Sequence, residues 1–134
     1  MPTQQEQLRH RTKRFALAVI RLVRGLPNRH EGWVIGKQIL RSATSVAANY
    51  RAAGRARSHA EFVAKLGTVV EEADESVFWL EILSDAAILD SHEIIPLLRE
   101  ANELLAIFAA SQQTAKKNTA PTPSQFEPGH PMTR

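Results

Sequence analysis

Apolar residues recur three or four positions apart over four long stretches of the chain, and this spacing predicts four amphipathic helices. No stretch shows the sustained alternation or the hairpin turns that are typical of β-strands. The predicted helices cover about residues 5–25, 31–54, 58–87 and 90–114. Because the segments between them are short, the pattern indicates an all-α fold, an antiparallel up-down-up-down four-helix bundle.

Local signals mark the ends of the helices and of the domain. Pro27 follows the first helix, and Ser58 with Glu61 three residues later forms a capping-box pair at the start of the third. After the fourth helix the chain has four prolines, few apolar residues and no periodicity. We therefore expect a bundle domain over residues 1–114 and a disordered C-terminal tail over residues 115–134.

Composition excludes several classes of protein. The chain has no cysteine, so it forms no disulfide and has no thiolate chemistry. Its apolar runs are much shorter than the ~20 residues that span a bilayer, and its N-terminus has no apolar signal region. These features predict a cytoplasmic protein that does not associate with membranes.

The net charge of +3 hides a division along the chain. Residues 1–57 hold twelve basic and two acidic residues, a net charge of +10, whereas residues 58–103 hold two basic and eleven acidic residues, a net charge of −9. One interpretation is a basic surface for RNA or DNA, because clustered Lys and Arg gain affinity by releasing counterions from phosphates. The other is internal complementarity, in which basic helices pack beside acidic ones within the bundle or across subunits.

Basic residues line up along the first two predicted helices. The positions that we expect to face nucleic acid are Arg14, Arg21, Arg24, Lys37, Arg41, Arg51 and Arg55, with His10 on the same line. Lys37 and Arg55 lie ~27 Å apart along a helix axis, long enough to follow several phosphates. Because no aromatic residues alternate with these cations, binding should depend on backbone charge rather than on base sequence.

The third predicted helix has more apolar surface than one stripe can account for. Phe78, Trp79 and Ile82 lie away from the stripe that begins at Phe62, and Phe78 and Ile82 are helical neighbours. A wide core or the fourth helix could cover them, but buried aromatics also concentrate at subunit interfaces. We favour an oligomer interface at these three residues and expect a homo-oligomer.

The sequence offers no catalytic constellation. Di-metal sites in helical bundles use Glu-x-x-His pairs, and the only such pair, Glu127 with His130, lies in the tail with Pro128 and Gly129 between them. The acidic cluster over residues 71–75 falls outside the apolar stripe, which favours a solvated or ion-paired face. Nucleophile sets, phosphate loops and dinucleotide fingerprints are also missing. We therefore predict a non-enzymatic protein with no catalytic residue, metal or cofactor.

A small, polar stripe on the second predicted helix suggests close helix packing. Its members are Gln38, Ser42, Ser45 and Asn49, short side chains that let another helix approach. Gln38 and Asn49 can bridge helices by hydrogen bonds, and a buried amide fixes helix register because a slip would leave it unpaired, at a cost of ~1–3 kcal/mol. We favour a structural role for this motif, with direct ligand contact as the alternative.

The segment QILRSATSVAANYRAAGRARS over residues 38–58, with EEADESVFWLEIL over residues 71–83, resembles a known family. It is similar to the bacterial four-helix-bundle proteins encoded within intervening sequences of large-subunit ribosomal RNA genes, over about residues 13–114. The resemblance implies a small cytosolic homo-pentamer. A related group, the accessory proteins of diversity-generating retroelements, implies basic barrels that engage a reverse transcriptase and nucleic acid.

The chain departs from the family pattern after Asn49, where Arg51, Ala52 and Ala53 stand in place of an acidic residue.

The charge pattern, the apolar surface of the third helix and the family resemblance together suggest two alternative functions. The first is a self-associating bundle that binds RNA or DNA through its first two helices. The second is an oligomeric scaffold with a protein partner and no nucleic-acid role.

Overall fold

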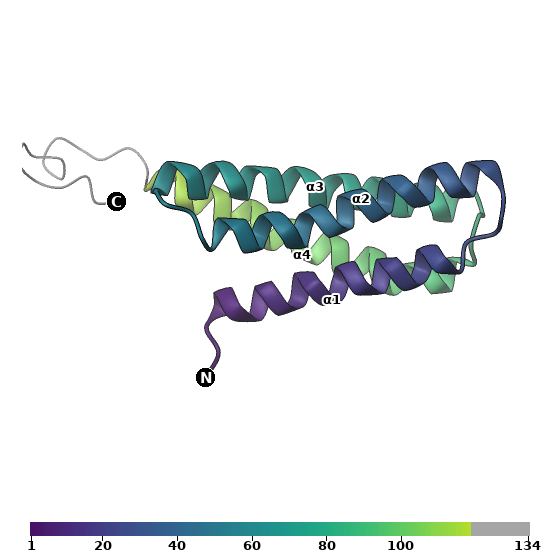
Figure 1. Ribbon diagram of the computed structural model, residues 1–134, viewed down its shortest axis with the longest axis horizontal. Helices are drawn as coiled ribbons and strands as arrows, with labels where there is room; N and C mark the ends of the chain where they lie inside the picture. The colour runs from purple at the N-terminus through teal and green to yellow at the C-terminus, as the bar shows by residue number, and fades with distance from the viewer. Residues whose placement is uncertain (119–134) are drawn as a thin grey trace, which may run out of the picture.

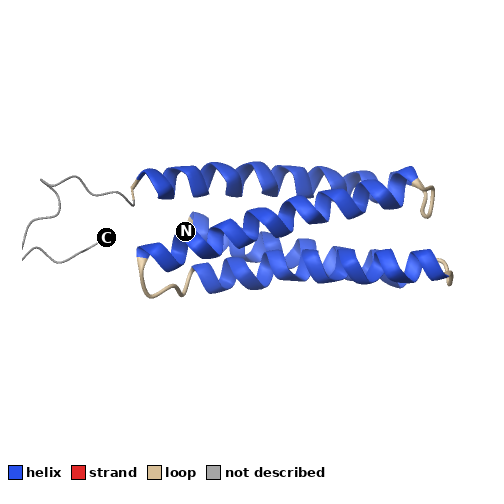
Figure 2. Ribbon diagram, turned by 90° about the horizontal axis from the view of Figure 1, so that it is seen from above, coloured by secondary structure: helices blue, strands red, loops and turns tan. Residues whose placement is uncertain are grey.

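The computed structural model describes residues 1–118, which form four helices: α1 (Gln4–Arg24), α2 (His30–Ala53), α3 (His59–Asp85) and α4 (Ser91–Lys117). The chain reverses direction at each connection, so that the four rods share one long axis (Figure 1). A view turned by 90° shows short loops at the two ends of the bundle and no strand in the described part of the chain (Figure 2). The predicted all-α four-helix architecture is confirmed.

Side-chain caps explain where two of the helices begin. Thr3 accepts a hydrogen bond from the Glu6 amide at 3.0 Å, and the Glu6 carboxylate accepts one from the Thr3 amide at 2.9 Å, which completes a capping box that the sequence analysis missed. Ser58 accepts from the Glu61 amide at 3.0 Å as predicted. The Glu61 carboxylate, however, accepts from the Arg57 amide at 3.2 Å. The predicted capping box at α3 is therefore only half formed.

The fourth helix continues to Lys117, three residues beyond its predicted end. Ala115 is buried, and its carbonyl oxygen lies 2.9 Å from Nε2 of His59 at the start of α3. This contact between the end of α4 and the start of α3 explains the extra residues, because the helix gains a partner there. The predicted disordered tail over residues 115–134 is therefore wrong for residues 115–117, which are helical. Its remainder, with the pair Glu127 and His130, falls within residues 119–134, outside the described part of the chain.

The core runs the length of the bundle and receives residues from every helix. Its large, fully buried members are Val19 from α1, Ile39 and Val46 from α2, Leu66, Val69, Leu80 and Leu83 from α3, and Ile94, Leu104 and Phe108 from α4. Burial of each such side chain contributes roughly 1.5–3 kcal/mol relative to exposure. The rings of Tyr50 and Phe108, 4.9 Å apart, join α2 to α4 through this core. Burial also raises the pKa of Tyr50.

The first helix packs unevenly on its two neighbours. It lies mainly against α2 and makes far less contact with α4, whereas α3 packs extensively on both α2 and α4. Near the α1–α2 loop the approach is very close, since a Cβ at Gly36 would lie only 2.8 Å from Cδ1 of Leu26. At the other end of this interface, a Cβ at Gly54 would lie 2.5 Å from Nε2 of Gln5. Close approaches thus stand at both ends of the α1–α2 interface.

Candidate nucleic-acid interface: a basic groove between α1 and α2

A groove of about 640 Å³ lies between the N-terminal half of α1 and the C-terminal half of α2. Its lining residues are Arg9, His10, Lys13 and Ala16 from α1, and Thr44, Ala47, Ala48, Arg51 and Arg55 from α2. We call this the basic groove. Ala16 is buried, and Thr44 and Ala47 are half-buried, whereas the charged side chains are exposed. The groove therefore combines small side chains at its base with cations along both sides.

Three of the four cations of the basic groove have no acidic partner within residues 1–118. They are Lys13 on α1 and Arg51 and Arg55 on α2. The fourth, Arg9, interacts electrostatically with Glu6, which is the one acid of α1 and also bonds to Thr3. The one acid of α2 is in its first turn, at the far end of the helix from the groove. The two helices therefore leave most of the positive charge of the groove uncompensated.

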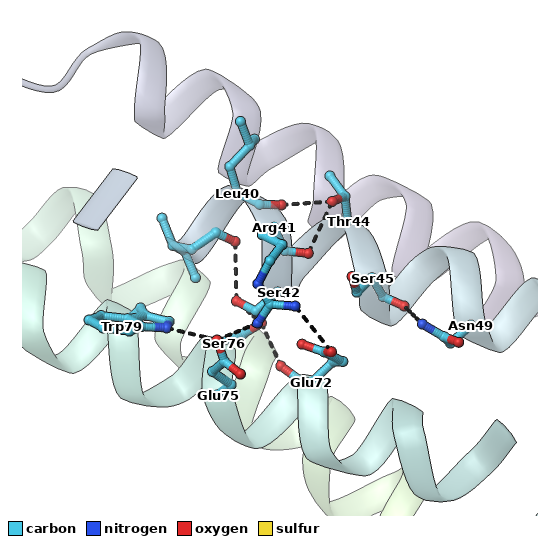
Figure 3. Close-up of polar contacts among 11 residues, drawn as sticks. Leu40, Arg41, Ser42, Thr44, Ser45, Asn49, Glu72, Glu75, Ser76 and Trp79 are labelled. Carbon is cyan, nitrogen blue, oxygen red and sulfur yellow. Dashed lines mark hydrogen bonds and ion pairs between the residues drawn. The ribbon is translucent and has the colours of Figure 1, made fainter. Parts of the chain in front are cut away.

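At the α2–α3 interface, by contrast, the cation Arg41 is paired with acids. The Arg41 guanidinium donates to Glu75 and, at 3.2 Å, to Oε2 of Glu72 (Figure 3). Oε2 of Glu75 also accepts from the Trp79 indole at 3.1 Å. The hydrogen bond from Arg41, followed by that from Trp79, lowers the pKa of Glu75 below its usual value. Arg41, which we expected to face nucleic acid, is instead held in ion pairs within the chain.

Serine hydroxyls form the buried polar contact between α2 and α3. The oxygens of Ser42 and Ser76 lie 3.1 Å apart, and both side chains are fully buried (Figure 3). Each hydroxyl also reaches a carbonyl of its own helix, that of Ile39 at 3.3 Å for Ser42 and that of Glu72 at 2.8 Å for Ser76. The structure therefore places Ser42 in the helix contact for which the small polar motif was selected.

The other members of that motif do not bridge the helices. The Asn49 side-chain amide donates to the Ser45 carbonyl at 2.9 Å, a bond within α2 (Figure 3). Gln38 is half-buried and makes no hydrogen bond within residues 1–118. The predicted bridging by these two amides is absent because helical geometry offers Asn49 a carbonyl one turn back on its own helix.

The remaining predicted cations are dispersed. Arg14, Arg21 and Arg24 are exposed on α1 but do not line the basic groove. The Lys37 ammonium lies 4.7 Å from the centre of the Trp33 ring, a cation–π contact. Of the seven positions in the predicted binding set, only Arg51 and Arg55 line the basic groove together.

Sequence reasoning selected His10 on α1 but missed Arg9 and Lys13. Their signal was available, because both flank the buried stripe of α1 at positions four residues apart, beside the small residue Ala16. The alanines at 47 and 48 on α2 form a matching small patch opposite. Small residues facing each other between two basic helices are the pattern that would have located the groove.

The bundle covers part of the additional apolar surface of α3, which consists of Phe78, Trp79 and Ile82. Trp79 is half-buried against the core and donates its indole N–H to Glu75. Phe78 remains 49% exposed, with its ring 4.9 Å from that of Trp79. Ile82 is half-buried. Phe78 is thus the residue of the predicted oligomer interface that the bundle leaves open.

Neither a metal-binding cluster nor a membrane-spanning helix is present among the described residues. No three His, Asp or Glu side chains of residues 1–118 gather in a group that could hold a metal ion. None of the four helices combines the length and the apolar character needed to cross a membrane. The basic groove itself contains one imidazole and four cations but no carboxylate.

The architecture defines a small four-helix-bundle protein with a cationic groove. The chain belongs to the family of 23S rRNA-intervening sequence proteins, whose family model matches residues 4–110. A similar solved structure is that of a protein of unknown function from the S23 ribosomal protein family of Bacteroides thetaiotaomicron. It is 29% identical, with a TM-score of 0.76 over 83% of this chain and 99% of that chain. A search of curated proteins gives no match. The resemblance found in the sequence is confirmed.

Proposed function

We propose that this protein is a non-enzymatic, self-associating helical bundle that binds the phosphate backbone of RNA or DNA through the basic groove. One observation carries the proposal. Two helices contribute Arg9, Lys13, Arg51 and Arg55 to one groove, and three of these cations, Lys13, Arg51 and Arg55, have no acidic partner within residues 1–118. Unpaired cations at this density attract a polyanion, because each phosphate contact releases a condensed counterion.

The lining also predicts the kind of recognition. No Phe, Tyr or Trp side chain lines the basic groove, and the imidazole of His10 is the one aromatic ring there on which a base can stack. Contacts to phosphate oxygens fix position on a nucleic acid without reading its sequence. Binding should therefore be strongly dependent on salt and only weakly dependent on sequence.

The alternative is an oligomeric scaffold that contacts proteins only. In favour of it, several cations are already paired within the chain, among them Arg41 with α3 and Arg11 with α4. Arg11 donates to Glu100 at 2.7 Å and to Glu103 at 2.6 Å. Such pairing at every arginine would leave no surface for a polyanion. The basic groove instead gathers Lys13, Arg51 and Arg55, none of which has an acidic partner within residues 1–118, and this supports the nucleic-acid function over the scaffold.

Self-association is proposed to involve the exposed face of α3. Phe78 lies in the middle of this face, and the other exposed residues there are Glu71, Asp74, Glu81 and Asp85. An exposed aromatic ring surrounded by acids fits a surface of opposite charge, and α1 and α2 supply one on a second copy. The expected assembly is the pentamer that the family resemblance implies.

Salt titration tests the nucleic-acid proposal. A fluorescently labelled oligonucleotide is titrated with the full chain at two salt concentrations, and the dissociation constant is measured by fluorescence anisotropy. With four phosphate contacts, the slope of log K against log salt should be about −3 to −4. Absence of binding at low salt, or binding that does not change with salt, rejects the proposal.

Sedimentation velocity tests self-association independently. The wild type should sediment as an oligomer, and Phe78→Glu should dissociate it by placing another charge on an acidic face. Ile95→Glu is the matched control, because Ile95 is a similarly exposed apolar residue on α4, which has no part in the proposed interface, 42% exposed against 49% for Phe78. A monomeric wild type, or equal dissociation by both variants, contradicts this part of the proposal.

A further inference from the structure

We infer that the basic groove admits a single strand of nucleic acid and not a duplex. This inference rests on the proposed function and adds the form of the ligand. The cations stand on two separate helices, with Arg9 and Lys13 on one side of the groove and Arg51 and Arg55 on the other. A ligand that contacts both sides must enter the space between them.

The spacing of the cations suits an extended strand. On each helix the two basic residues are four positions apart, which corresponds to ~6 Å along the axis. Successive phosphates of an extended strand have a comparable separation. Each side of the groove can therefore contact two neighbouring phosphates, and the strand runs along the α1–α2 interface.

The size of the groove argues against a duplex. Packed helices lie ~8–10 Å apart, and the groove between α1 and α2 has a volume of about 640 Å³. A duplex presents its phosphates on a convex cylinder that is broader than this space, so it can touch only one side or the outer rims. A single strand loses no such contacts, because its backbone is narrow and flexible.

The floor of the groove offers few groups that could distinguish ribose from deoxyribose or one nucleobase from another. Ala16, Ala47 and Ala48 offer only methyl groups, and the hydroxyl of Thr44 donates to the Leu40 carbonyl at 2.7 Å. The lining has no carboxylate, so the side-chain acceptors available to a ribose 2′-hydroxyl are limited to the Thr44 hydroxyl and the His10 imidazole. RNA and DNA strands of the same sequence should therefore bind with comparable affinity.

A variant that fills the groove without changing its charge tests this inference. Ala48 is exposed and lines the groove, so Ala48→Leu places extra volume there with little effect on folding. Leucine is preferred to an aromatic residue, because an added ring could stack on bases and strengthen binding. Ala64→Leu is the matched control, since Ala64 is an exposed alanine on α3.

The binding experiment uses the full chain with labelled single-stranded RNA, single-stranded DNA and a blunt DNA duplex of equal length. The wild type should bind either strand at least about tenfold more tightly than the duplex, and Ala48→Leu should remove about tenfold of that affinity. Ala64→Leu should match the wild type. Circular dichroism confirms that both variants retain their helices.

The outcomes separate this inference from the proposed function. If the duplex binds as tightly as the strands, or if Ala48→Leu binds them like the wild type, the groove does not select a strand. Salt-dependent binding in the same experiment would still support the proposed function. If none of the three nucleic acids binds at low salt, the proposed function fails and the inference fails with it.

Discussion

The two long interfaces of α2 differ in whether their arginines are paired with acids. On the side of α3, Arg41 is paired with Glu72 and Glu75, and the helices are joined by a fully buried serine contact. On the side of α1, Arg51 lines an open groove and has no acidic partner within residues 1–118. The same helix is therefore closed and neutral on one side and open and charged on the other.

The difference shows that the position of a charge in the sequence does not determine whether it is available. Residues 1–57 have a net charge of +10, but a cation that faces α3 or α4 meets an acid, as Arg41 and Arg11 do. Lys13, Arg51 and Arg55, which face between α1 and α2, have no acidic partner within residues 1–118.

Charge reversal in the groove should give the largest effect. Arg51→Glu with Arg55→Glu replaces two attractive contacts by two repulsive ones, and we expect nucleic-acid affinity to fall by about 100-fold or more. The salt slope should become shallower by about two, one for each lost phosphate contact. Anisotropy titrations at several salt concentrations measure both quantities.

The control for this double variant keeps the change in net charge and moves it away from the groove. Arg29→Glu with Arg99→Glu alters two exposed arginines outside the groove lining. This control should lose much less affinity and keep most of its salt slope. Equal losses in the two double variants would mean that net charge, and not the groove, governs binding.

Substitutions at the α2–α3 interface should lower the stability of the protein without changing its affinity for nucleic acid. Ser42→Ala and Ser76→Ala each leave a buried hydroxyl with one partner fewer, at a cost of about 1–2 kcal/mol in the free energy of unfolding. The double variant removes both hydroxyls and should cost less than the sum. Urea unfolding of the wild type and the three serine variants measures this coupling. Strict additivity of the serine variants would contradict the assigned contact.

Thr44→Ala at the groove is the control for these variants. It should cost less than about 0.5 kcal/mol in the free energy of unfolding, since the Thr44 hydroxyl bonds only within α2.

The fold could be predicted because its determinants are local. The three-and-four spacing of apolar residues and the cap at Ser58 depend on neighbours within one or two turns, so the predicted helices agree closely with the observed bounds. Where a distant contact matters, the prediction fell short. The contact between His59 and Ala115 joins residues 56 positions apart and extends α4 beyond residue 114.

The candidate site could be predicted only in part. Helical periodicity placed Arg41, Arg51 and Arg55 on one outer side of the second helix, and they are exposed there. Their surroundings differ because of the register between the helices. This register brings Glu72 and Glu75, which lie 31 and 34 positions further along the chain, to Arg41, but brings no acid to Arg51 or Arg55. No local pattern encodes that register, although the small residues at 47 and 48 indicate where helices can leave a groove.

The attachment of α1 to α4 should show an intermediate effect. Arg11→Gln removes the bonds to Glu100 and Glu103 from an interface with few other contacts, so we expect a loss of about 1 kcal/mol in the free energy of unfolding. Amide hydrogen exchange should increase mainly in α1, because the other helices keep their contacts. Arg14→Gln is the matched control, since Arg14 is exposed and has no acidic partner within residues 1–118. Uniform acceleration in all four helices would show that Arg11 does not act on α1 alone.

The smallest effect should come from the ion pairs of Arg41 and should depend on pH. Because the folded state lowers the pKa of Glu75 from its usual 4.5, this carboxylate stabilises the fold above that pH and loses its contribution as the pH falls through the folded-state value. Arg41→Gln should therefore be less stable than the wild type by under about 1 kcal/mol near pH ~6. The two proteins should converge toward pH ~3, as urea midpoints across this range would show. Arg55→Gln, on the open side of α2, should match the wild type at every pH. A deficit of Arg41→Gln that persisted at low pH would mean that the Arg41 side chain stabilises α2 on α3 by packing rather than by charge.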